Sequence, residues 1–271
     1  MRGSATEARV RRLRCPAEAR ESGGSVVATK RSRRRTAARA IACAIVLLQP
    51  FAAASAHAAS LGGAYFIDDA EIPKMNVCES EQWGSFGSNR DRVFVVNPAC
   101  TVNLGRPVEI GATFIRARQD GEWATLQAAT AKTVLTPIEP GRLGVGLSGA
   151  VVYDWNARAL NSLVVNVPLS YEPVQDLRLN VNVGWIYDAS LSRHFLTTGG
   201  GFAWGFTKQW SLLGEVFAVV GQEQANPRVQ AGLRYTPIDA VDIDVLYGHN
   251  IQGERAHWIT LGLNFRIGDN R

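Results

Sequence analysis

Ionisable and amide side chains recur at alternate positions in several segments of the C-terminal half of the chain. Residues 178–182 carry an arginine and two asparagines at every second position, and residues 242–244 carry two aspartates with the same spacing. Positions two apart on a β-strand face the same side. The candidate residues are Arg178, Asn180, Asn182, Glu215, Arg234, Asp242, Asp244 and Arg266. They could line a path for ions or ligands, or they could pair with one another and fill a closed interior.

Residues that could perform hydrolysis occur together in one polar stretch, which contains Asp188, Ser190, Ser192 and His194. A serine nucleophile needs a neighbouring base, but such residues are common in loops. The Gly-x-Gly-x-x-Gly spacing at 144–149 is followed by strand-like residues, whereas nucleotide binding requires a helix there. The histidines and cysteines do not have metal-site spacing. The sequence therefore predicts no enzyme, cofactor or metal, and a barrel hydrolase is the weakest alternative.

The elements that must position these side chains are strands. Apolar and polar residues alternate through Leu163–Tyr171, and the alternation resumes through Leu177–Tyr187. The turn-forming stretch 173–176 separates the two runs, which predicts an antiparallel hairpin. Each arm has about nine to eleven residues, the length of a tilted strand that crosses a bilayer.

Turn signals recur along the chain from Cys78 onward, and they divide it into hairpins of similar length. The pattern predicts an all-β fold, an antiparallel up-and-down transmembrane β-barrel of about twelve strands, with ten as the alternative. The weakest strands by pattern are 78–86 and 123–136. Aromatic residues at strand ends favour a membrane barrel over a soluble β domain. They are Tyr153, Tyr171, Trp185, Tyr187, Tyr235, Tyr247 and Trp258.

The N-terminal region has the parts of a secretory signal. Residues 1–58 carry twelve Lys and Arg against three Glu, whereas the remainder carries 17 basic and 21 acidic residues. The basic run 30–39 precedes an apolar stretch, and small residues allow cleavage after Ala56 or Ala58. We therefore expect a leader at 1–58, a periplasmic N-terminal segment at 59–77, a barrel at 78–267 and a tail at 268–271. The mildly acidic body argues against nucleic-acid binding.

Cys78 and Cys100 are the cysteines that remain after the leader. A hairpin that turns at Asn89 pairs these two positions directly, and the residues around Asn89 are turn-prone. Directly paired residues on antiparallel strands lie within reach of a disulfide. We therefore predict a Cys78–Cys100 disulfide between the first two strands, with two free thiols as the alternative.

Several stretches resemble the outer-membrane β-barrel transporter family named for the meta-pathway of phenol degradation (MetA-pathway family). That family carries an Asp-Asp-Ala segment closed by proline near its mature N-terminus. The matching residues here are Phe66, Asp68, Asp69, Ala70 and Pro73, and later similarities cover 163–173, 213–217, 229–237 and 259–266. Ile67, Ile72 and Lys74 depart from the family pattern. The resemblance implies a twelve-stranded barrel and uptake of hydrophobic or aromatic compounds.

The sequence thus predicts a channel or transporter in the outer membrane of a Gram-negative bacterium, which passes small hydrophobic or aromatic molecules by passive diffusion. The alternatives are a structural or adhesive barrel with a closed lumen and a barrel hydrolase. The expected partners are outer-membrane lipid, a small apolar or aromatic solute, and the secretion and barrel-assembly machinery.

Overall fold

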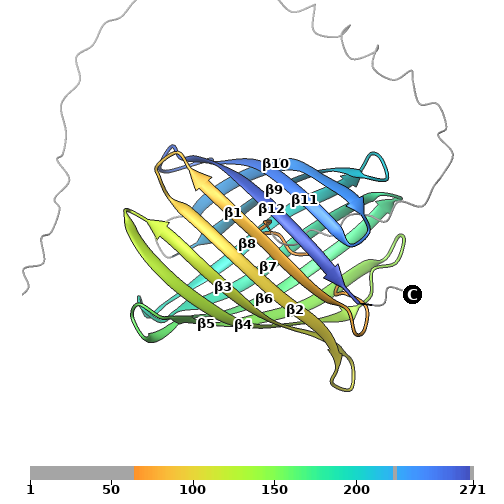
Figure 1. The fold of residues 1–271 in the computed structure, drawn as a ribbon, viewed down its shortest axis with the longest axis horizontal. Helices are drawn as coiled ribbons and strands as arrows, with labels where there is room; N and C mark the ends of the chain where they lie inside the picture. The colour runs from red at the N-terminus through yellow and green to blue at the C-terminus, as the bar shows by residue number, and fades with distance from the viewer. Residues whose placement is uncertain (1–63, 222–224, 269–271) are drawn as a thin grey trace, which may run out of the picture. The chain divides into compact units, whose positions relative to one another are not determined.

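The computed structural model describes residues 64–221 and 225–268. Within these ranges the chain forms twelve antiparallel strands that close into one barrel (Figure 1). The strands are β1 (Cys78–Gly87), β2 (Arg92–Asn103), β3 (Pro107–Gln119), β4 (Glu122–Thr136), β5 (Leu143–Asp154), β6 (Ala159–Val174), β7 (Leu177–Asp188), β8 (Arg193–Gly205), β9 (Trp210–Val220), β10 (Ala225–Ile238), β11 (Val241–Asn250) and β12 (His257–Ile267). The predicted twelve-stranded barrel is confirmed, and the ten-stranded alternative is wrong.

The barrel closes where β1 pairs with β12, in a register that joins Cys78 to Ile267 and Gly87 to Trp258. Every other strand pairs with its neighbours in sequence order. Closure leaves no unpaired strand edge. We call the end of the barrel that carries Cys78 and Ile267 the terminal rim, and the other end the far rim. No helix in residues 64–221 and 225–268 is long and apolar enough to cross a membrane.

The alternation of side chains places apolar residues outside the barrel and polar residues inside. On β7, Leu179, Val181 and Val183 are exposed, whereas Asn180 and Asn182 are buried. On β12, Ile259 and Leu261 are exposed, whereas Thr260 is buried. An apolar exterior around a polar interior is the inverse of a soluble barrel.

One aromatic residue does not follow the expected pattern of strand-end aromatics. Trp258 turns inward, where its indole Nε1 donates to Gln230 Oε1 at 3.0 Å. Gly248 makes room for it, because a Cβ at that position would lie 2.4 Å from the indole ring. Trp258 therefore belongs to the interior and not to an exterior aromatic belt. Trp83 also packs inside, against a small cluster that includes Tyr65 and Leu213.

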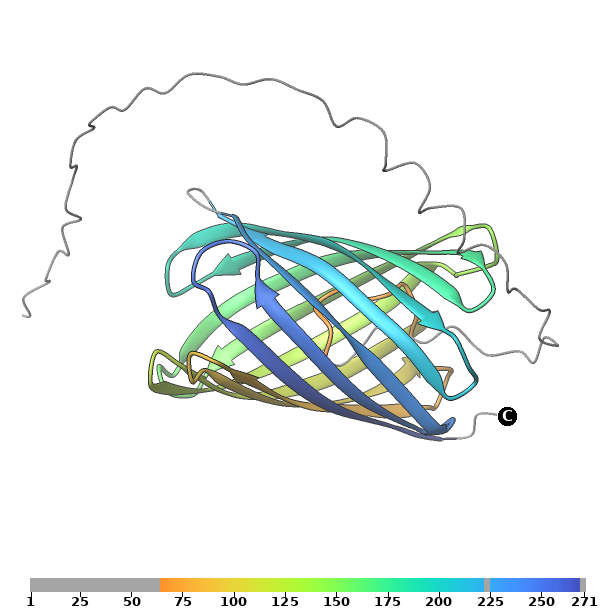
Figure 2. The same cartoon turned by 90° about the horizontal axis from the view of Figure 1, so that it is seen from above.

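The segment that precedes the barrel lies inside it. Figure 2 shows this part of the chain crossing the interior, and Ile67 and Ala70 are almost completely buried there. Residues 64–73, which we call the inner segment, therefore lie inside the barrel, which corrects the expected periplasmic placement for this part of 59–77; residues 59–63 lie outside the described residues. The segment goes inside because its polar groups find partners on the inner strand faces. The predicted leader at 1–58 and most of the predicted tail lie outside the described residues.

The predicted hairpin register is confirmed, since β1 pairs with β2 so that Cys78 is directly opposite Cys100. The two Cα atoms are 4.0 Å apart, and the sulfur atoms are joined as a disulfide. The bond links the first two strands at the terminal rim.

Candidate functional site

The interior wall binds the main chain of the inner segment. The backbone N–H groups of Phe66 and Ile67 donate to the two carboxylate oxygens of Glu215, at 2.9 and 2.8 Å. Gln230 Nε2 donates both to the Ala64 carbonyl oxygen (3.1 Å) and to Glu215 (2.8 Å). A buried carboxylate needs such donors, because burial without hydrogen bonds is strongly unfavourable. Glu215 therefore acts as an anchor for the inner segment.

A second anchor lies on β6 and β7. The Ala70 N–H donates to Ser170 Oγ at 2.8 Å. The Asn182 amide, in the orientation that satisfies both of its ends, donates to the Asp68 carbonyl oxygen and accepts from the Asp68 N–H, each at 2.8 Å. Each of these contacts is made to main-chain atoms of the inner segment. They place the segment at a fixed height in the lumen.

Glycines in the strands make room for the inner segment. A Cβ at Gly199 would lie 2.6 Å from Ile67 Cδ1, and a Cβ at Gly146 would lie 3.4 Å from Ala70 Cα. Gly199 thus admits both Ile67 and the neighbouring strand, whose Val216 carbonyl oxygen would lie 2.5 Å from such a Cβ, whereas at Gly146 the nearest atom is Pro168 Cγ at 2.9 Å. No phosphate-binding turn is involved.

Charged side chains of the inner segment pair with two cations on the wall. Lys132 Nζ lies 2.7 Å from Asp68 and 3.5 Å from Asp69. Arg178 contacts Asp69 at 3.1 Å and Glu71 at 2.6 Å, and it also pairs with Glu172 on β6. The Asp-Asp-Ala motif is therefore an ion-pairing element. Tyr65, near the start of the segment, packs among apolar residues, and burial raises the pKa of its phenol, so it stays neutral.

The structure places all eight sequence-predicted residues on the inner face. Arg178, Asn180, Asn182, Glu215, Arg234, Asp242 and Asp244 are buried, and Arg266 is partly buried. Several of them pair with one another: Arg234 Nε lies 2.7 Å from Asp244, and Arg266 pairs with Asp242. Of the eight, Asn182, Arg234, Asp242 and Arg266 also line an open cavity.

Sequence reasoning missed four charged residues on the other side of the lumen: Glu79 and Glu81 on β1, Glu109 on β3 and Lys132 on β4. A signal was present for two of them, because Glu79 and Glu81 alternate with the outward-facing Cys78. Two of the three strands, β1 and β4, are the least regular by pattern, which hides their inner faces. Asp68 and Asp69 were recognised only as a family motif.

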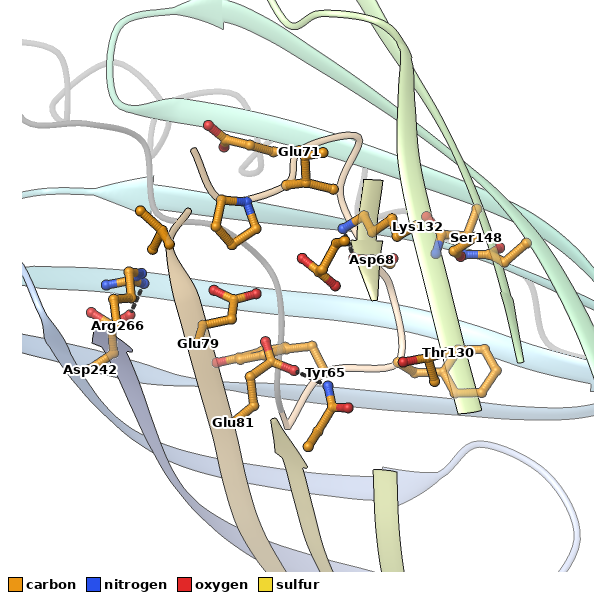
Figure 3. Close-up of a pocket in the computed structure, with 18 of the residues that line it drawn as sticks. Tyr65, Asp68, Glu71, Glu79, Glu81, Thr130, Lys132, Ser148, Asp242 and Arg266 are labelled. Carbon is orange, nitrogen blue, oxygen red and sulfur yellow. Dashed lines mark hydrogen bonds and ion pairs between the residues drawn. The ribbon is translucent and has the colours of Figure 1, made fainter. Parts of the chain in front are cut away.

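A cavity of about 860 Å³ is lined by the inner segment, by this wall, and by residues on other strands that include Ser148, Asp242 and Arg266 (Figure 3). It is lined by Thr207 and Lys208, in the turn between β8 and β9 at the terminal rim, and by Ile186, close to the far-rim end of β7. The cavity therefore extends past the inner segment along much of the barrel. Its apolar lining includes Tyr65, Phe66, Ile72, Pro73 and Val77.

Only some of the charged side chains that line the cavity form ion pairs. The carboxylates are Asp68, Glu71, Glu79, Glu81, Glu109, Asp239 and Asp242, and the cations are Lys74, Lys132, Lys208, Arg234 and Arg266. Lys132, Arg234 and Arg266 pair with aspartates. Glu79, Glu81 and Glu109 form no ion pair with any residue in 64–221 or 225–268, and Glu81 accepts only from the Asn97 amide at 3.1 Å. These three residues form what we call the glutamate wall, and with them seven carboxyl side chains and five cationic side chains line the cavity.

The residues considered for hydrolysis do not form a catalytic arrangement. Ser190 Oγ donates to Asp188 at 2.6 Å, whereas His194 stacks against Tyr187 and Trp185. Within the described ranges no hydrogen bond joins His194 to Ser190 or Asp188. In the same ranges no group of His, Cys, Asp and Glu is arranged to hold a metal ion.

Solved structures with a similar fold include porins. The chain is similar to the KdgM porin with a TM-score of 0.55 and 10% identity, over 69% of this chain and 98% of that chain. It is similar to the NanC porin with a TM-score of 0.54 and 10% identity, over 69% of this chain and 100% of that chain. A second KdgM structure, described as a complex with disordered oligogalacturonate, gives a TM-score of 0.52 at 10% identity, over 70% of this chain and 98% of that chain. At this identity the likeness shows the fold.

No curated protein sequence matches the chain. A family model does match, over residues 47–267, and it carries the description "Uncharacterised conserved protein UCP029691". That description names neither phenol degradation nor a solute. The match spans the whole barrel and the inner segment, and the chain therefore belongs to the UCP029691 family.

Proposed function

We propose that the protein is an outer-membrane channel of a Gram-negative bacterium that passes small solutes by passive diffusion. One observation carries the proposal: a cavity with charged walls extends past the inner segment inside a closed barrel whose exterior is apolar. An apolar exterior suits hydrocarbon, and a polar lumen suits water and dissolved solutes. In this proposal the secretion and barrel-assembly machinery delivers the chain to the membrane.

The solute in this proposal is a small, largely hydrophobic or aromatic molecule that also carries a cationic or hydrogen-bond-donating group. The apolar lining at Tyr65, Phe66 and Ile72 supports the hydrophobic part, as does the family resemblance of the motif. The glutamate wall supports the polar part, because carboxylates that line a pore favour cations. The oligogalacturonate named with one KdgM structure is a polyanion, and a carboxylate-lined cavity would repel it.

A closed barrel is the second candidate function, and the anchoring of the inner segment favours it. The segment is held by Glu215, Ser170 and Arg178, and it occupies part of the lumen. A barrel blocked in this way would serve a structural or adhesive role.

Single-channel recording of the refolded mature chain in a planar bilayer separates the two functions. A channel gives discrete current steps in potassium chloride, whereas a closed barrel gives the current of the bare membrane. Protein that was denatured and not refolded is the control. Swelling of vesicles in phenol, benzylamine and benzoate then compares aromatic solutes of different charge. The proposal expects benzylamine to enter fastest and benzoate slowest, and equal rates would contradict the proposed solute class.

A further inference from the structure

The exterior of the barrel carries a group of arginines at the far rim of β1–β4. Register places Phe86 opposite Arg92, Arg92 opposite Arg118, and Arg118 opposite Trp123. The row therefore follows one line of paired residues across four adjacent strands near the far rim, with two arginines between two aromatic residues. In the next row, Phe94 is opposite Arg116. We call Phe86, Arg92, Phe94, Arg116, Arg118 and Trp123 the arginine patch.

Directly paired residues on antiparallel strands share a face. Phe86, Phe94 and Trp123 are exposed on the outer face of the barrel, so their partners Arg92, Arg116 and Arg118 are on that face too. Arg92 and Arg116 are exposed, and Arg118 is half-buried. The patch thus lies where the apolar exterior ends.

The arginines of the patch are not neutralised by the protein. None of the three forms an ion pair with a residue in 64–221 or 225–268. The polar contacts are those of Arg116 with Thr125 Oγ1 and of Arg118 with the Gly121 carbonyl oxygen. Arg92 and Arg118 are directly opposite each other, and like charges in that position are destabilising. An anion held between the guanidinium groups would remove this repulsion.

The aromatic residues hold the guanidinium groups at the edge of the apolar surface. Arg116 lies over the Trp123 ring at 4.9 Å, and Arg92 lies over the Phe86 ring at 6.0 Å. The Phe94 ring packs against both Phe86 and Trp123, at 5.7 and 6.5 Å. Guanidinium groups that stack on aromatic rings are pre-oriented for bidentate contact with phosphate.

We propose that the arginine patch binds the phosphate group of an anionic lipid. The patch supplies guanidinium groups at the rim for the phosphate, and the neighbouring apolar wall, which includes Val96 and Phe114, supplies a surface for the acyl chains. The inference rests on the membrane location proposed above and does not depend on whether the lumen conducts. It assigns a binding role to residues outside the cavity.

The test is lipid binding to the refolded mature chain in a zwitterionic detergent. Phosphatidic acid and phosphatidylcholine with identical acyl chains are the probes, and native mass spectrometry or fluorescence titration gives the dissociation constants. We expect phosphatidic acid to bind about tenfold more tightly, because its phosphomonoester carries more negative charge and, unlike the phosphate of phosphatidylcholine, is not offset by a choline cation. The triple substitution R92Q, R116Q and R118Q should remove most of that difference.

The matched control is the triple substitution R158Q, R193Q and R255Q, which removes the same charge from other exposed positions at the far rim. It should leave the preference for phosphatidic acid unchanged. A heat-dependent shift in gel mobility checks that each variant is folded. If the triple variant does not fold, Arg116→Gln alone serves, with a smaller loss in the same direction.

Three outcomes would overturn the proposal: equal binding of the two lipids, full binding by the folded patch variant, or displacement of phosphatidic acid by equimolar inorganic phosphate. The last result would mean that the patch recognises phosphate and not a lipid. Conductance of the same samples separates the two hypotheses. Selective lipid binding without current would support the arginine patch as a lipid site and contradict the channel. Current without lipid selectivity would support the channel and contradict the lipid site.

Discussion

Two sides of the lumen differ in whether their charged side chains are paired. On the side formed by β6, β7 and β9–β11, which we call the anchoring wall, Arg178, Glu215 and Arg234 are buried and satisfied by specific partners. On the glutamate wall, three carboxylates face the cavity without an ion pair to any described residue. The comparison indicates that the paired charges hold the structure together, whereas in the proposed channel the carboxylates without ion pairs would act on the solute.

The strongest test of the anchoring wall is Arg234→Ala. Arg234 and Asp244 are 2% and 0% exposed, and removing one partner leaves a buried charge, which typically costs about 3–5 kcal/mol. Urea-dependent unfolding from lipid vesicles measures the free energy of unfolding. The control is Arg142→Ala, since the Arg142–Glu139 pair has the same 2.7 Å separation but side chains that are 72% and 49% exposed. We expect a loss of at most about 1 kcal/mol for that exposed pair. Equal losses of unfolding free energy in the two variants would mean that burial does not strengthen the Arg234–Asp244 pair.

The disulfide between β1 and β2 gives the next largest effect. Cys78 and Cys100 are 22 residues apart in sequence, and a loop of this size predicts a stabilisation of roughly 3 kcal/mol. The double substitution C78S and C100S should lower the free energy of unfolding by that amount. Mass spectrometry of unreduced protein checks that the bond forms. Two free thiols in the mature chain would contradict the disulfide between β1 and β2.

Glu215→Gln tests whether the anchor positions the inner segment. The change removes one of two carboxylate acceptors, so the N–H of Phe66 or Ile67 loses its partner, at a cost of about 1–3 kcal/mol. A looser segment should also raise single-channel conductance. Glu172→Gln is the comparison. The Glu172 carboxylate accepts hydrogen bonds from Arg178, and it forms none with the described residues of the inner segment. Unchanged conductance in Glu215→Gln would show that the segment does not restrict the path.

The glutamate wall should show the smallest effect on stability and the clearest effect on permeation. The triple substitution E79Q, E81Q and E109Q replaces partly buried carboxyl groups that form no ion pair with a described residue, so the free energy of unfolding should not fall. The reversal potential in a potassium chloride gradient should move from cation preference toward no preference. The exposed set E122Q, E139Q and E254Q should leave it unchanged. A marked decrease in the free energy of unfolding would mean that the three glutamates stabilise the fold.

The sequence was sufficient to predict the strands and the inner faces of the anchoring wall. Strict alternation around Arg178, Asn180 and Asn182 determines which side chains point inward, because a strand has only two faces. The register between Cys78 and Cys100 also followed from turn-forming residues at their midpoint. These features depend on neighbours in the chain.

The inner segment could not be placed from sequence because its contacts are distant in the chain. Phe66 bonds to Glu215, which is 149 positions away, and Ala70 bonds to Ser170, which is 100 positions away. The segment has no period of two that would indicate a strand. The glutamate wall was missed for another reason, since the outer face of β1 carries Ser80, Gln82 and Gly84 and is not clearly apolar. Without that contrast the inward-facing glutamates gave no clear signal.

The position of the inner segment restricts the order in which the barrel can be built. The segment precedes β1 in the chain, yet its anchors are on β6, β7, β9 and β10, which are synthesised later. It cannot reach its partners until those strands exist, and the pairing of β1 with β12 closes the wall around it. Capture of the segment and closure of the seam are therefore late and linked steps. A barrel whose segment has not yet docked would have a wider lumen than the mature one.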